Sequence, residues 1–145
     1  MNTVADFFDG GALAVVGAST NPRAFGNAAY KTLKEHGVQV YPVNPNYAEV
    51  EGDHCYKSLS ELPTGVTAAV FVLTPAAAVK AVDEARAAGI NRIWFQQGGD
   101  YRQAAKLAEE AGMQVVKKKC ILLYSQPVTG VHAFHRFFVK LFGRL

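Results

Sequence analysis

Short apolar runs alternate with longer helical stretches along this chain, and that alternation constrains its fold more than any other feature. The apolar runs predict strands at residues 12–16, 38–43, 68–73, 91–95 and 113–116. Apolar side chains at three- and four-residue spacing predict helices at residues 23–36, 75–88 and 101–111. Strands separated by such helices are typical of βαβ crossovers and a parallel sheet. Because the runs are apolar throughout, helices should cover both faces. The sequence therefore predicts an α/β fold, a Rossmann-like, doubly wound and mainly parallel sheet.

Helix boundaries and irregular stretches complete the predicted order of elements. Thr74 is expected to cap the middle helix, with Pro75 at its first position and Gly89 beyond its end. Residues 46–64 are expected to be irregular, with a short strand near 54–56 and one helical turn near 58–62. An amphipathic helix is expected at about 129–142. No linker or repeat interrupts this order, so we expect one domain over residues 1–145.

Composition excludes several classes of protein. Half of the 145 residues are hydrophobic and 19% are charged, as in a compact globular domain. The net charge of +3 is mild, and the absence of an aromatic and basic ladder argues against nucleic acid as a partner. No apolar run reaches the roughly 18 residues that a membrane span needs. Cys55 and Cys120 lie far apart in the sequence, which argues against a disulfide framework and a zinc site. We therefore expect a cytoplasmic protein without a bound metal.

The loop after the first predicted strand is the strongest candidate for a ligand site. Residues 17–26 (GASTNPRAFG) contain two glycines, two hydroxyls and the cation of Arg23, immediately before a helix. Free backbone amides at a helix N-terminus attract phosphate, and hydroxyl and guanidinium groups add donors. The loop therefore predicts an anion site. The alternative is a simple strand-to-helix turn with a Ser or Thr cap.

The pattern departs from that of a dinucleotide-binding protein. Ser19 stands where the second glycine of the G-x-G-x-x-G fingerprint would be. The second strand ends in Val43-Asn44-Pro45, without the acid that binds the ribose of NAD or an arginine suited to NADP. These two departures disfavour NAD and NADP. An NAD(P)-dependent oxidoreductase nevertheless remains an alternative, although the sequence presents no identifiable catalytic residue.

Four motifs in order give the chain a family resemblance. They are V-V-G-A-S at 15–19, Y-P-V-N-P at 41–45 with a later E-G at 51–52, I-W-F-Q-Q-G at 93–98 and V-V-K-K-K-C at 115–120. Over about residues 8–125 the chain resembles the stand-alone CoA-binding proteins, which are similar to the N-terminal CoA-binding domain of the succinyl-CoA synthetase α subunit. The resemblance implies coenzyme A or an acyl-CoA as ligand. A partner-requiring acyl-CoA ligase subunit is a further alternative.

The resemblance also implies where the parts of CoA bind. Its phosphates would be held by Gly17, Ser19, Arg23 and Gly26, in a loop that also contributes Ala18 and Phe25. Val43, Asn44 and Pro45 would flank the ribose, and Thr74 and Pro75 would line the adenine. The thiol arm would pass the loop with Gln97 and Gly98, for which the alternative is an ordinary strand end. The apolar residues of the last predicted helix are compatible with a homodimer.

Overall fold

A five-stranded parallel sheet forms the centre of the molecule in the computed structural model, which describes residues 7–8, 12–96 and 100–119. The strand order across the sheet is β2-β1-β5-β6-β7, and each neighbouring pair is parallel. The strands are β1 (Leu13–Val16), β2 (Val40–Val43), β5 (Ala68–Phe71), β6 (Arg92–Gln96) and β7 (Gln114–Lys119). The predicted mainly parallel α/β sheet is confirmed.

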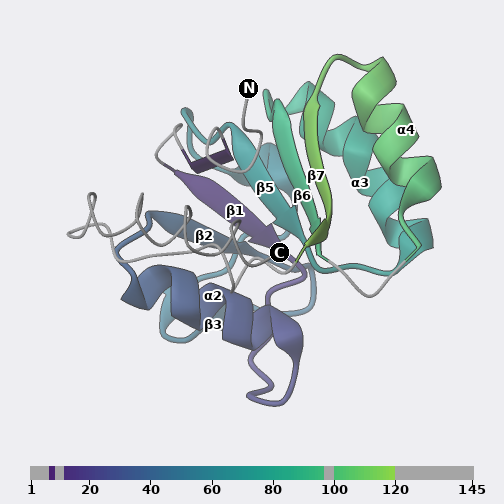
Figure 1. Ribbon diagram of the computed structural model, residues 1–145. Helices are drawn as coiled ribbons and strands as arrows, with labels where there is room; N and C mark the ends of the chain where they lie inside the picture. The colour runs from purple at the N-terminus through teal and green to yellow at the C-terminus, as the bar shows by residue number, and fades with distance from the viewer. Residues whose placement is uncertain (1–6, 9–11, 97–99, 120–145) are drawn as a thin grey trace, which may run out of the picture.

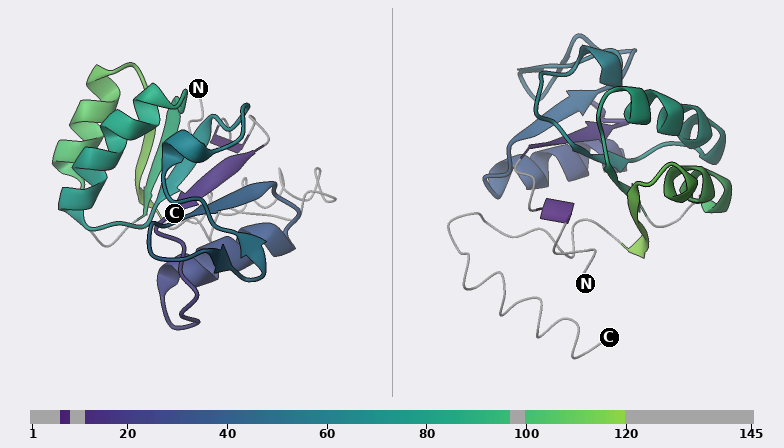
Figure 2. Two further views of the ribbon diagram at one scale, coloured as in Figure 1. Left: turned by 180° about the vertical axis from the view of Figure 1, so that it is seen from behind. Right: turned by 90° about the horizontal axis from the view of Figure 1, so that it is seen from above.

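Helices cover both faces of the sheet, as the unbroken apolar strands require. Figures 1 and 2 show α2 (Phe25–Glu35) on one face, and α3 (Pro75–Ala87) with α4 (Arg102–Glu110) on the other. The β1–α2–β2 crossover thus lies on the opposite side from the β5–α3–β6 and β6–α4–β7 crossovers. This arrangement is the predicted doubly wound architecture.

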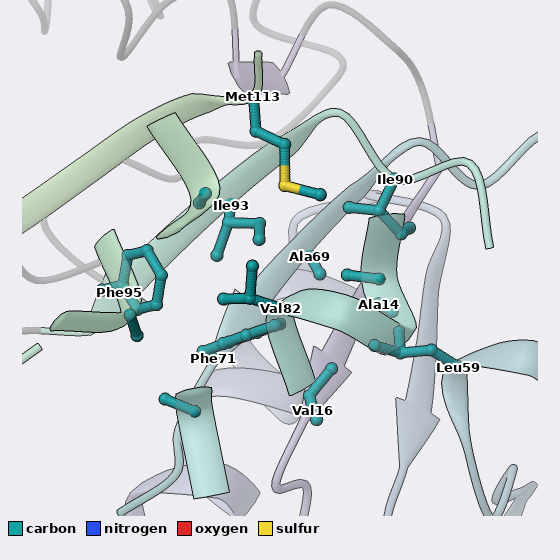
Figure 3. Close-up of a cluster of buried hydrophobic side chains, with 14 of the residues drawn as sticks. Ala14, Val16, Leu59, Ala69, Phe71, Val82, Ile90, Ile93, Phe95 and Met113 are labelled. Atoms are coloured by element: carbon teal, nitrogen blue, oxygen red, sulfur yellow. The ribbon is translucent and has the colours of Figure 1, made fainter. Parts of the chain in front are cut away.

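Each face of the sheet has its own hydrophobic core because successive strand residues point to opposite sides. Leu13 and Val15 of β1 pack with Ala29, Tyr30 and Leu33 of α2. On the other face, Ala14 and Val16 belong to the cluster beneath α3 and α4. Figure 3 shows this second cluster, in which Val82 of α3 lies among Phe71, Ile93 and Phe95 of the sheet. The β1 residues of both cores are buried, which explains why that run contains no polar side chain.

The stretch between β2 and β5 contains more structure than the sequence predicted. A small antiparallel hairpin forms from β3 (Glu49–Val50) and β4 (Asp53–His54), and the 3₁₀ turn η1 (Leu59–Glu61) follows it. The predicted turn near 58–62 is therefore present. The strand expected near 54–56 is instead one arm of this hairpin, followed by an isolated parallel bridge from Tyr56 to Val43.

Other boundaries differ by a few residues. The first helix starts at Phe25 rather than near Arg23, because residues 21–24 form a turn closed by the Ala24 N–H to Asn21 carbonyl bond at 2.9 Å. The last strand continues to Lys119. The helix expected at 129–142, on which the homodimer expectation rested, lies outside the described residues.

Candidate functional site

The strand order reverses between β1 and β5. The chain runs outward from β1 to β2, then returns to β5 on the other side of β1. The loops that leave β1 and β5 therefore turn to opposite faces of the sheet, toward α2 and α3. Such a reversal opens a crevice at the carboxyl ends of the strands, where open α/β sheets bind their ligands. The predicted Gly17–Gly26 loop and the Thr74-Pro75 pair lie on this edge.

Glycines allow the backbone segments at this point to approach one another closely. Gly17 has a φ of 99°, and a Cβ atom there would lie 2.0 Å from the carbonyl oxygen of Val72 in the segment after β5. A Cβ atom on Gly26 would lie 2.0 Å from the carbonyl oxygen of Gly17. Both glycines are thus required by packing, and the start of α2 is held tightly against the end of β1.

The N-terminus of α2 faces this loop without a side-chain cap. Ala24 is the N-cap residue and supplies no side-chain acceptor. Within the described part of the chain, the backbone amides of Phe25 and Gly26 have no hydrogen-bond acceptor. Uncapped amides and the positive end of the helix dipole favour an anion. The Ser or Thr cap offered as the alternative to an anion site is absent from this helix.

Internal hydrogen bonds give the rest of the loop a defined shape. The Asn21 amide donates to Ser19 Oγ at 3.0 Å, and the Arg23 amide donates to Asn21 Oδ1 at 3.0 Å. Ala18 is fully buried, and its carbonyl accepts a hydrogen bond from Asn44 Nδ2, so this residue presents no exposed surface to a ligand. Arg23 is exposed, and its guanidinium forms no hydrogen bond or ion pair with any residue that the structure describes. A cation in this position is available to an anionic ligand.

The end of β2 supports the loop from one side. Asn44 Nδ2 donates to the Ala18 carbonyl at 2.9 Å, and Asn44 Oδ1 accepts from the Asn46 amide at 2.9 Å. Val43 is buried and Pro45 is exposed. Val43 and Asn44 thus contact the loop, the Val43 carbonyl by accepting the Gly17 amide at 2.9 Å, but the Asn44 side chain is occupied by the protein itself. Whether they flank a ribose stays a prediction.

A second support comes from the β3–β4 hairpin, which the sequence did not predict. Asn27, buried in the first turn of α2, donates from Nδ2 to the Ser19 carbonyl at 2.9 Å and to Glu51 Oε2 at 2.8 Å. The Tyr47 hydroxyl lies 3.5 Å from Ser19 Oγ. An acidic side chain therefore does reach the first loop, although none follows β2 directly. The signals that could have revealed this contact are a polar residue on the buried face of a helix and the turn pair Glu51-Gly52.

The same hairpin is fastened to α2 at a second point. Asp53 Oδ2 accepts from Lys34 Nζ at 2.7 Å and from the Tyr30 hydroxyl. These two donors lower the pKa of Asp53 below its usual 3.8. Burial, with the Asp53 carboxylate as the next cause, raises the pKa of Tyr30, so the phenol stays protonated and donates this bond.

The segment after β5 forms the other wall of the crevice. Thr74 caps α3 by accepting the Ala77 amide at 3.3 Å, with Pro75 at the first helical position, as predicted. The Tyr101 hydroxyl donates to the Leu73 carbonyl, and burial raises the pKa of Tyr101.

An open cleft of about 790 Å³ lies between the first turns of α3 and α4. It is lined by Pro75, Ala76, Val79, Asp100, Arg102, Gln103, Ala104 and Lys106. The predicted positions Gln97 and Gly98 lie outside the described residues.

Two features are absent from the described ranges, a cluster of metal-binding side chains and a membrane-spanning helix. No group of three or more His, Cys, Asp or Glu residues in them could hold a metal ion. No helix in them is long and apolar enough to cross a membrane.

Comparison with known proteins assigns the chain to a family. The family model described as the CoA binding domain matches residues 12–126. The chain belongs to this CoA-binding domain family. The match includes the β1–α2 loop, the end of β2 and the segment after β5. These three segments of the candidate site therefore all lie in the CoA-binding domain. The resemblance noted in the sequence is thereby confirmed.

Solved structures of similar size share the arrangement. A conserved hypothetical protein from Pyrococcus furiosus is 41% identical, with a TM-score of 0.73 over 77% of this chain and 96% of that one. A hypothetical protein from Pyrococcus horikoshii OT3 is 34% identical, with a TM-score of 0.78 over 84% of this chain and 88% of that one. The CoA-binding domain in this chain therefore has relatives that consist of little else.

Curated relatives are longer enzymes that contain a similar domain. The α subunit of the ADP-forming acetate–CoA ligase II of Pyrococcus furiosus is 29% identical over 126 residues, which cover 79% of this chain and 28% of that subunit. The ADP-forming acetate–CoA ligase I of Archaeoglobus fulgidus is 28% identical over 134 residues, 86% of this chain and 20% of the ligase. The chain thus spans less than a third of the length of these enzymes.

Proposed function

We propose that this domain binds coenzyme A or an acyl-CoA, with the phosphates at the loop between β1 and α2. The observation that carries the proposal is the uncapped N-terminus of α2, where the amides of Phe25 and Gly26 lack an acceptor among the described residues and the exposed Arg23 precedes them in the same loop. Membership of the CoA-binding domain family supports CoA as the anion. Backbone amides and a guanidinium are the donors that a pyrophosphate requires.

The remainder of the ligand would extend along the crevice. Its adenosine would lie against the edge formed by Pro45 and the segment at Thr74 and Pro75, which borders the loop. In this assignment the domain binds and orients CoA, and no described residue is assigned a catalytic role.

Isothermal titration tests the ligand class. We expect saturable binding of CoA, tighter than that of ADP, NAD or NADP. Binding of NAD or NADP without CoA would overturn the proposal and favour an oxidoreductase.

The Arg23→Ala variant tests the site. Loss of one charge-assisted hydrogen bond to phosphate should weaken CoA binding about tenfold. Arg86→Ala is the matched control, because Arg86 is an exposed arginine of α3 that pairs only with Asp83, at 3.8 Å. Equal affinities for the two variants would contradict the assignment of the phosphate site to this loop.

A second candidate function follows from the curated relatives. Acetate–CoA ligases contain a similar domain, so this chain could serve as the CoA-binding part of a ligase completed by other chains or domains. This alternative predicts formation of ATP from acetyl-CoA, ADP and phosphate only when the remaining parts of the ligase are supplied.

A further inference from the structure

The β3–β4 hairpin contacts the phosphate loop through one buried amide. Asn27 is 2% exposed and donates one hydrogen bond to the Ser19 carbonyl and one to the Glu51 carboxylate. Both protons of the Asn27 amide are thus used, one on the loop and one on the hairpin. An amide held at both donors has a fixed orientation, and so has the loop carbonyl that it binds.

The backbone at Glu51 is unusual for its residue type. Glu51 has a φ of 52° and is the only non-glycine residue with positive φ among those that the structure describes. With Gly52, at a φ of 82°, it forms the two-residue turn between Val50 and Asp53. Such turns favour Asn or Gly at the first position, because other side chains are strained there. A strained residue that also makes a hydrogen bond to the site is a candidate for a functional role.

We propose that Glu51 is a positioning residue for CoA binding, acting through Asn27 on the Ser19 carbonyl to hold the β1–α2 loop in its ligand-accepting shape. This inference rests on the function proposed above. Glu51 itself touches no phosphate in this account. Its carboxylate fixes the Asn27 amide, and the amide fixes the loop whose free donors face the ligand.

Shortening the Glu51 side chain should change CoA affinity in opposite directions, depending on whether Glu51 acts only through its charge or by positioning the loop. CoA is a polyanion, so removal of a nearby negative charge would by itself strengthen binding. Removal of the hydrogen bond to Asn27 would instead loosen the loop, and CoA would have to order it on binding. The direction of the change in affinity therefore separates the two effects.

Three variants of Glu51 test the proposal. Gly and Asn both tolerate positive φ, and Asn is one methylene too short to reach Asn27, so E51G and E51N should fold yet lack the contact. We expect CoA affinity to fall about fivefold to tenfold in both. E51Q keeps an acceptor at the same reach and removes the charge, so it should bind CoA at least as tightly as the wild type. Thermal unfolding of each variant checks that the fold is retained. Wild-type or tighter binding by E51G and E51N would overturn the proposal.

A readout without ligand separates this proposal from the proposed function. Amide hydrogen exchange by NMR should become severalfold faster at Asn21 and Arg23 in E51G and E51N, but not in E51Q or in α3 of any variant. This result would show that Glu51 holds the β1–α2 loop in shape even if the wild type failed to bind CoA, a failure that would overturn the proposed function and leave the loop without an assigned ligand. Unchanged exchange in the loop of E51G and E51N would overturn the positioning role.

Discussion

Gly17 combines two requirements, a left-handed backbone conformation and a close approach to another segment, of which Gly65 has only the first. Its φ of 99° is unfavourable for a residue with a Cβ atom, and a Cβ atom there would also lie 2.0 Å from the Val72 carbonyl oxygen. Gly65 has the same φ of 99° but nothing within 4 Å of a Cβ atom. Substitutions at the two positions therefore separate two losses of stability, one from the close approach of a Cβ atom and one from the backbone conformation.

Alanine at these two glycines should have unequal effects on stability. Gly65→Ala should lower the free energy of unfolding by about 1 kcal/mol, because only the left-handed backbone is penalised. Gly17→Ala should cost more than about 3 kcal/mol, since the segment after β5 must also move. Urea denaturation of both variants measures the difference. Equal losses would show that the close approach at Val72 relaxes without cost.

Asp53 provides a stabilising contact that depends on pH. Hydrogen bonds from Lys34 and Tyr30 lower its pKa below the 3.8 expected of an unfolded chain. The folded state thus binds this proton less tightly than the unfolded state, so the contribution is present above about pH 4 and is lost as pH falls through the folded-state pKa.

The Asp53→Asn variant should reveal this dependence. At pH 7 it should be less stable than the wild type by up to about 1 kcal/mol, since the pair with Lys34 is half exposed. The difference should shrink as pH falls through the folded-state pKa of Asp53, because the protonated carboxyl is then as neutral as the amide. Asp83→Asn is the control. Asp83 pairs with Arg86 at 3.8 Å on the surface of α3, and its replacement should change the free energy of unfolding less. A deficit independent of pH would assign the effect to packing instead of charge.

At the scale of elements, the sequence predicted the strands and helices whose signals are local in the chain. The apolar run at β1 and the Thr74-Pro75 start of α3 are local signals, and the structure confirms both. The hairpin at Glu49–His54 was not predicted, because each arm has only two residues and three of the four are polar. Its stability comes from contacts with α2, which are distant in sequence.

The candidate site was likewise predicted only where its signals are local in the sequence. The loop at residues 17–26 was found because it joins a strand to a helix with small and polar residues, and it follows β1, beside which the strand order reverses. Asn27 was missed because one polar residue inside a helix resembles any surface position until its burial is known. The contact from Glu51 depends on a long-range fold that no spacing rule contains.

At the scale of the whole molecule, the fold itself brings the parts of the site together. Loops after β1 and β5 meet because the strand order reverses between them, and the end of β2 lies beside the same loop through Asn44. The family model spans all three segments. A ligand with phosphates, ribose, adenine and a long arm matches a crevice with several walls along one edge of a sheet.

An NMR titration of the labelled protein with CoA tests the central claim most directly, because it reports both binding and location. The account predicts saturable shifts of the backbone amides in the β1–α2 loop, largest at Phe25 and Gly26, with smaller shifts near Thr74. It predicts little change at the far end of α3. Absence of shifts at saturating CoA, or shifts confined to the cleft between α3 and α4, would contradict it.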